Sequence, residues 1–204
     1  MEFSTSAGPA AAVVENPAAP RAEPAFLLVL THGAGGGTET KDLLAASRAG
    51  RDAGGVAVRV LQPYRVRGAR APGAAGPQDA AWLEIIAALR SEFPGLPLIQ
   101  GGRSNGARVG CRTATAAGAA GVVALAFPLH PPGRAGSPEY SRAGELRAAG
   151  VPVLVINGAA DPFGVPDQAD AGQLVVLPGE THALSRNPSA IAAAVASWLP
   201  TVLG

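Results

Sequence analysis

The chain contains a single cysteine, Cys111, and its 204 residues carry a formal net charge of only +1. One cysteine excludes an internal disulfide, which is consistent with a reducing compartment. A net charge this small gives no electrostatic reason to expect binding to nucleic acid or to an anionic membrane surface. The length suits one domain whose core is large enough to fold without disulfides or metal ions.

Long uninterrupted hydrophobic runs are also missing. No window reaches the roughly 18 consecutive apolar residues typical of a membrane span, and the N-terminus lacks the basic start and continuous apolar core of a secretory signal. We therefore expect a soluble cytoplasmic protein. Residues 1–24 are rich in Ala and Pro, which predicts a flexible arm, with a short edge strand near residues 12–14, ahead of one domain at residues 25–204.

Short apolar runs alternate with helical patterns along this domain. Runs typical of buried strands lie at residues 25–30, 56–61, 98–100, 122–127, 153–156 and 174–177. Helical patterns lie at residues 41–53, 79–93, from 107, at 141–149 and from 187 onward. The alternation predicts an α/β fold of three layers, in which right-handed crossovers place helices on both faces of a mostly parallel sheet of about six to seven strands.

The stretch GRSNG, residues 102–106, directly follows one predicted strand and precedes a predicted helix. It is a G-x-S-x-G sequence, which typically holds its Ser in a strained turn with the hydroxyl exposed above the sheet edge. The glycines on both sides remove Cβ atoms that would clash where strand and helix meet. Because the chain contains 27 Gly, the pattern alone also fits an ordinary glycine-rich turn, and its partners decide between the two.

Polar residues follow several other predicted strands directly, and parallel strands end at one edge of their sheet. A Ser hydroxyl at position 104 needs a base within hydrogen-bond reach and a third group that orients the base. His182 is the candidate base and Asp161 the candidate acid, in the order Ser, Asp, His expected for a nucleophile on such a turn. The competing bases are His32 and His130, but both precede the candidate acid in the chain instead of following it. The fallback acids are Asp167 and Asp170.

The loop after the first strand of the domain, HGAG at residues 32–35, is a candidate source of oxyanion donors. It resembles the HG-rich segment that supplies one such N–H group, and we favour the N–H of Ala34, then that of Gly35. The other expected donor is the backbone N–H of Asn105, the residue after the Ser. A phosphate-binding loop at residues 33–37 is the alternative, but the segment lacks both the Lys-Ser/Thr ending and the G-x-G-x-x-G spacing.

Five segments occur in a fixed order: HGAGG, GRSNGAR, LAFPLHPPG, GAADPFG and GETH. In order and spacing they resemble the small α/β hydrolases related to dienelactone hydrolases, especially testis-expressed hydrolase-like proteins and the hydrolase-like domain of a histone-acetyltransferase complex subunit. The resemblance covers nearly everything after Ala25. It implies an α/β-hydrolase fold and a serine-hydrolase triad on Ser104, Asp161 and His182, but no known substrate.

Two departures from that family limit what the resemblance implies. Dienelactone hydrolases proper carry Cys where this chain has Ser104, so their lactone substrate is not carried over. Related members often have Met and Gly where this chain has Asn105 and Ala107. The side chain of Asn105 could therefore narrow or polarise the pocket.

These residues predict a hydrolase that cleaves a small carboxylic ester or thioester through an acyl-enzyme on Ser104. Only residues 62–78, expected to form a long loop, and residues 131–141 could cover the site, so we expect minimal or no lid. We expect no cofactor and no metal site, a small-molecule acyl substrate, no nucleic-acid or membrane partner, and a monomer or a dimer. Candidate substrate contacts are His32, Arg103 and His130, and the arginines that could favour a carboxylated substrate are Arg65, Arg67, Arg70 and Arg103.

Two other functions remain open at this point. A catalytically silent module of the same fold could bind a protein partner, because a fold does not fix a function. A complete Ser/Asp/His set argues against it, since a pure scaffold has no chemical need for all three. A peptidase is disfavoured because no second domain is present to select peptides.

Overall fold

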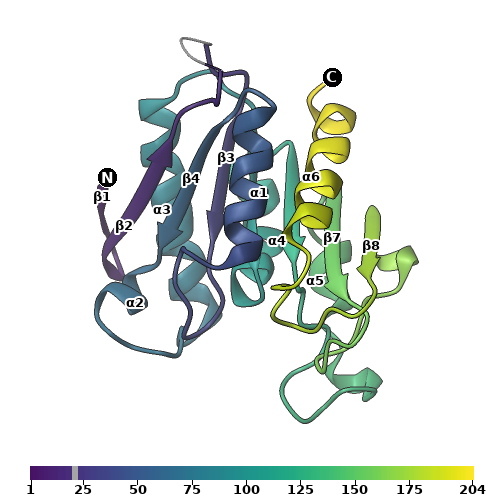
Figure 1. Cartoon of the computed structure of the whole chain (residues 1–204). Coiled ribbons are helices and arrows are strands. Elements are labelled where there is room, and N and C mark those ends of the chain that lie inside the picture. Colours follow the sequence, from purple (N-terminus) through teal and green to yellow (C-terminus); the bar gives the residue numbers. More distant parts are fainter. Residues whose placement is uncertain (20–22) are drawn as a thin grey trace.

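The computed structural model describes residues 1–19 and 23–204, and its eight strands form one sheet in the order β1-β2-β4-β3-β5-β6-β7-β8 (Figure 1). Strands β3 to β8 are parallel, as predicted. Because β3, β6 and β7 are buried along their whole length, they appear in the sequence as continuous apolar runs. The parallel strands are β3 (Leu27–Thr31), β4 (Val56–Leu61), β5 (Leu98–Arg103), β6 (Gly121–Leu125), β7 (Val153–Gly158) and β8 (Gln173–Leu177).

Helices cover both faces of the sheet, which gives the three layers expected (Figure 1). Alternate residues of β3 point to opposite faces. Leu27 and Val29 belong to the core beneath α3 and α4, whereas Leu28 and Leu30 belong to the core beneath α1 and α6. The helices are α1 (Lys41–Asp52), α2 (Pro63–Val66), α3 (Ala75–Glu92), α4 (Asn105–Ala117), α5 (Ala143–Arg147) and α6 (Pro188–Leu203).

The N-terminal segment is not a flexible arm along residues 2–15. β1 (Glu2–Thr5) and β2 (Gly8–Glu15) form an antiparallel hairpin, and β2 pairs antiparallel with β4. The edge strand expected near residues 12–14 lies within β2, and the hairpin raises the sheet to eight strands. Small side chains at alternate positions, among them Ala10 and Val14, pack on the core and fix the register. Residues 20–22 of the expected arm lie outside the described residues.

The prediction of a long loop at residues 62–78 is also wrong. It contains α2, and α3 begins at Ala75 rather than at residue 79, so only residues 67–74 are irregular. Residues 126–152, between β6 and β7, contain only the 3-10 helix η1 (Pro138–Tyr140) and the short α5. Within the described residues no inserted domain therefore covers the sheet edge, and the fold has no lid. Of the helices in residues 1–19 and 23–204, none combines the length and the apolar character needed to cross a membrane.

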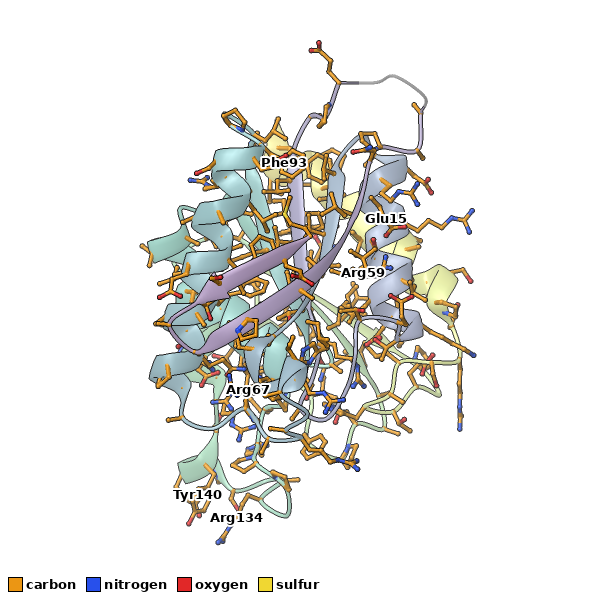
Figure 2. The ribbon with its side chains drawn as sticks, turned by 90° about the vertical axis from the view of Figure 1, so that its left-hand side faces the viewer. Glu15, Arg59, Arg67, Phe93, Arg134 and Tyr140 are labelled. Carbon is orange, nitrogen blue, oxygen red and sulfur yellow. The ribbon has the colours of Figure 1, made fainter. Side chains whose placement is uncertain are left out.

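An ion-pair network fixes the hairpin to the body of the domain. Glu15, at the end of β2, accepts hydrogen bonds from Arg59 on β4 and, in α1, from Ser47 Oγ at 3.0 Å and Arg51 Nη1 at 3.3 Å (Figure 2). The Arg59 side chain is only 6% exposed, and its other acid partner, Glu39, is 65% exposed. Glu15 is therefore the main compensation for a buried positive charge.

Replacing Glu15 should destabilise the whole domain, because a buried guanidinium left without its partner is costly. We expect Glu15→Gln to lower the free energy of unfolding by about 2–3 kcal/mol, less than for a fully buried pair since Glu15 keeps some solvent exposure. Urea unfolding followed by circular dichroism measures this change. Glu2→Gln, an exposed position on β1, is the matched control. Equal unfolding midpoints for the two variants would contradict the role of the network.

Candidate functional site

Ser104 lies in the tight turn between β5 and α4 that its sequence predicts. Its backbone has φ 52° and ψ −112°, a strained conformation for a residue with a side chain. The flanking glycines make the turn possible. A Cβ atom on Gly102 would lie 2.0 Å from the carbonyl oxygen of Thr31, and one on Gly106 would lie 2.5 Å from the same atom. Any larger residue at either position would push β5 and α4 away from the end of β3.

The structure brings Ser104, His182 and Asp161 together at the carboxyl edge of the sheet. Ser104 Oγ lies 2.9 Å from His182 Nε2, and His182 Nδ1 lies 2.8 Å from Asp161 Oδ2. Asp161 follows β7 and His182 follows β8, so adjacent strands deliver the acid and the base. With Nδ1–H donated to Asp161, Nε2 is free to accept the proton of the Ser104 hydroxyl.

Asp161 is held as a buried acceptor. Its side chain is 0% exposed. Its Oδ1 accepts a hydrogen bond from the backbone N–H of Phe163 at 2.9 Å, and its Oδ2 accepts one from Asn157 Nδ2 at 3.4 Å. The Phe163 ring meets the His182 ring edge-on, with centroids 4.4 Å apart. The fallback acids take no part: Asp167 precedes the 3-10 helix η2 (Gln168–Asp170) without a side-chain capping bond, and Asp170 pairs with Arg147 at 2.5 Å.

Arg103, a predicted substrate contact, holds the loop that carries the base. Its Nη2 donates a hydrogen bond to the backbone carbonyl of His182 at 2.6 Å, and its Nε donates to Asp42 Oδ2 at 2.7 Å. Asp42 lies in the first turn of α1, and its side chain is completely buried. Arg103 therefore ties the turn of Ser104 to the backbone of His182. One face of Arg103 still lines the cleft beside Ser104.

Glu180 is a supporting residue that the sequence reasoning missed. Its buried carboxylate accepts hydrogen bonds from three backbone N–H groups, those of Ser185 at 3.1 Å, Arg186 at 2.7 Å and Asn187 at 2.6 Å. These contacts close the loop around His182 before α6 begins. The available signal was a Glu two residues before the candidate base, in a loop that has to turn back into a helix.

Two of the three predicted oxyanion donors lie beside the cleft that contains Ser104. Ala34 and Asn105 line the same cleft as Ser104, whereas Gly35 does not. Within the described part of the chain, the N–H groups of Ala34 and Asn105 donate to no other protein group. A Cβ atom on Gly33 would lie 3.1 Å from Ser104 Cβ, so the loop after β3 rests against the turn. Two N–H groups without a protein acceptor therefore belong to residues that line the same cleft as Ser104.

The other predicted substrate contacts do not reach the cleft. The His32 ring is completely buried beneath the oxyanion loop, where Nδ1–H donates to the carbonyl of Gly33 at 2.9 Å and Nε2 accepts from the N–H of Gln62 at 3.0 Å. Burial lowers the pKa of His32. The hydrogen bond to Gly33 raises this pKa by a smaller amount, and the nearby positive charge of Arg65 lowers it. His130 is buried against Gly164. Both ring nitrogens of His32 therefore form hydrogen bonds with backbone groups, which the sequence alone does not reveal.

The cleft beside Ser104 has a volume of about 360 Å³, which is within the range of small-molecule sites. Phe163, Pro128 and Pro132 give it apolar walls. Among the described residues, no group of three or more His, Cys, Asp or Glu side chains is placed to hold a metal ion. The cleft therefore suits a small, partly apolar molecule.

The lowered pKa of His32 predicts a pH dependence of stability. Its ordinary pKa of 6.5 applies to the unfolded chain, so below that pH the unfolded state binds more protons and stability falls. Between about pH 7.5 and about pH 5.5, wild type should lose more free energy of unfolding than His32→Gln, which cannot take up a proton there. Urea unfolding at the two pH values measures the difference. Equal losses would show that His32 charges freely in the folded protein.

Comparison with known sequences and structures agrees with this architecture. The profile of a family described as "Alpha/beta hydrolase domain" matches residues 24–183, which include Ser104, Asp161 and His182. No curated protein matches the chain.

Several solved structures share the fold over nearly the whole chain. XC6422 from Xanthomonas campestris, an α/β serine hydrolase without a lid, is 21% identical with a TM-score of 0.75, over 98% of this chain and 93% of its own. An α/β serine hydrolase homologue from Coxiella burnetii is 16% identical with a TM-score of 0.78, over 98% and 96%. Est1E from Butyrivibrio proteoclasticus, with ferulic acid bound, is 17% identical with a TM-score of 0.72, over 100% and 99%. Since the family match spans well over half of the sequence, the chain belongs to the α/β-hydrolase domain family.

Proposed function

We propose that the protein is a serine hydrolase of the dienelactone-hydrolase-like branch that cleaves small carboxylic esters or thioesters. The observation that carries the proposal is the continuous hydrogen-bonded line from Ser104 through His182 to Asp161, beside two unused backbone donors. We further propose that it acts in the cytoplasm, as a monomer or a dimer, without a cofactor, a metal or a nucleic-acid partner.

The proposed reaction runs through an acyl-enzyme. Ser104 Oγ attacks the carbonyl carbon of the ester while its proton passes to His182 Nε2, and Asp161 stabilises the imidazolium that forms. The carbonyl oxygen becomes an oxyanion that accepts hydrogen bonds from the N–H groups of Ala34 and Asn105. The intermediate collapses as His182 returns its proton to the leaving alcohol or thiol. A water molecule, deprotonated by the same imidazole, then releases the acid by the same steps in reverse order.

The shape of the site is compatible with a small ester or thioester substrate. The cleft is open, lies at the sheet edge and is large enough for a small acyl group. The ferulic acid held by Est1E is a carboxylic acid, the type of product that an ester hydrolase releases. A catalytically silent binding module is the alternative, but it would not need an aligned hydroxyl, imidazole and carboxylate, nor a strained turn to present them.

Removing either proton-transfer partner should abolish most turnover. We expect Ser104→Ala and His182→Ala each to lower kcat by at least about 1,000-fold and by similar factors, because members of such a triad act as a unit. Asp161→Asn should lose a comparable or somewhat smaller factor. The rates are measured with p-nitrophenyl esters of graded acyl length, and circular dichroism checks folding.

A fluorophosphonate probe separates an enzyme from a binding module. It should label wild type but not Ser104→Ala, because the probe bonds only to an activated hydroxyl. Unchanged turnover in Asp161→Asn would show that the acid is misassigned. If the probe labels neither wild type nor Ser104→Ala, and neither protein cleaves an ester, the result would favour the binding module.

Arg103 should act by positioning the base. We expect Arg103→Met to lower kcat by about 10- to 100-fold at nearly constant KM, since a small displacement of His182 is enough for such a loss. Arg103→Lys should recover only part of the rate, because one ammonium group cannot reproduce the two-sided contact of a guanidinium. Steady-state kinetics with one neutral ester separate kcat from KM. A rise in KM at constant kcat would instead make Arg103 the substrate contact that the sequence predicted.

A further inference from the structure

The charged side chains that line the Ser104 cleft are all arginines. Three arginines line the cleft, Arg103, Arg108 and Arg142, and no Asp or Glu is among its described lining residues. A cleft with this lining attracts anionic groups and disfavours cationic ones. What distinguishes the three arginines is whether the protein itself supplies a partner.

Two of the three arginines have their own carboxylates behind the cleft wall. Arg103 pairs with the buried Asp42. Arg108 makes a two-point contact with Glu145, from Nε to Oε2 at 2.8 Å and from Nη2 to Oε1 at 2.6 Å. Both guanidinium groups are therefore neutralised by the protein and are poorly available to a ligand.

Arg142 has no such partner. Its Nη1 donates only to the backbone carbonyls of Pro128 at 3.2 Å and His130 at 3.3 Å, and among the described residues no carboxylate lies within ion-pair distance. Partial burial lowers the pKa of Arg142, and the positive charge of Arg108 lowers it further, against a smaller opposing effect of Glu145. The two carbonyl contacts orient the guanidinium on the cleft wall and leave Nε and Nη2 without a protein acceptor.

A second donor on the same cleft also lacks a partner. The Nδ2 of Asn105 is buried and has no hydrogen-bond partner among the described residues. A buried amide N–H without an acceptor is unfavourable, and such groups normally find one. Asn105 follows Ser104 in the chain and lines the same cleft, so an acceptor on a bound substrate would satisfy its amide.

We propose that the substrate carries a carboxylate in addition to its ester or thioester group, and that Arg142 binds this carboxylate while the Asn105 amide provides a further donor. The inference rests on the proposed hydrolase function and specifies its substrate class. The proposal assigns carboxylate binding to Arg142 instead of to the arginines that the sequence suggested for this role. Unlike Arg142, none of Arg65, Arg67 and Arg70 is among the lining residues of the Ser104 cleft.

The carboxylate could belong to the acyl group or to the leaving group, and two matched ester pairs separate these sources. The first pair is mono-p-nitrophenyl adipate and p-nitrophenyl hexanoate, which differ in the charge of the acyl chain. The second pair is 4-acetoxybenzoate and 4-acetoxybenzamide, which differ in the charge of the leaving group. In one of the pairs we expect the carboxylated ester to have a kcat/KM at least about tenfold higher, as one charged hydrogen bond allows.

Two arginine variants on one loop assign the preference. Arg142→Gln should reduce the tenfold ratio between the carboxylated and the neutral ester to about one. Arg134→Gln is the matched control, because Arg134 lies on the same loop but outside the cleft lining, 4.6 Å over the ring of Tyr140 (Figure 2). It should keep the wild-type ratio. An uncharged fluorophosphonate, which needs no carboxylate, reports whether the site of each variant is intact.

The possible outcomes separate this inference from the function on which it rests. Equal kcat/KM values within both pairs in wild type would overturn the carboxylate proposal, and this comparison needs no variant at all. A preference that survives in Arg142→Gln would overturn the role of Arg142. In both cases Ser104-dependent hydrolysis would leave the proposed function standing. If wild type neither reacts with the probe nor cleaves any of the four esters, the proposed function and this inference both fail.

Discussion

The close backbone contact between the ends of β3 and β5 is the constraint on which the rest of the site depends. Thr31 and Gly102 are partners in the parallel ladder, and the carbonyl of Thr31 lies so close to Gly102 and Gly106 that neither position has room for a Cβ atom. Because the two strands end side by side, the loop after β3 rests against the turn after β5. The proposed nucleophile, Ser104, and the proposed oxyanion donors therefore follow one pair of neighbouring strands.

The proposed base and acid are held in place by side chains that form hydrogen bonds with backbone groups of the loops. Asp161 follows β7, two strands away from β5 in the sheet, and His182 follows β8, three strands away from β5. Glu180 closes the loop of His182 by accepting three N–H groups, and Arg103 joins that loop to the turn of Ser104. Charged groups around this site thus hold loops in place. Among the cleft arginines of the described residues, Arg103 and Arg108 each pair with a carboxylate, whereas Arg142 donates only to carbonyl groups.

The sequence predicted those features that local pattern determines. Strands β3 to β8 are buried by helices on both faces and therefore show as apolar runs, and Ser104, Asp161 and His182 could be selected because each follows such a run. Only the end of the hairpin β1–β2, an edge strand near residues 12–14, was predicted, since its Ala-rich strands carry little hydrophobic signal and are fixed by the contact of Glu15 with Arg59. His32 was misplaced for a similar reason, because Gln62, which donates to its ring, lies far along the chain.

The most direct test of this account is a crystal structure of the protein after reaction with a fluorophosphonate. The account predicts phosphorus bonded to Ser104 Oγ, with the phosphoryl oxygen within hydrogen-bond distance of the N–H groups of both Ala34 and Asn105. Phosphorus bonded to another residue, or a phosphoryl oxygen turned away from both donors, would contradict it.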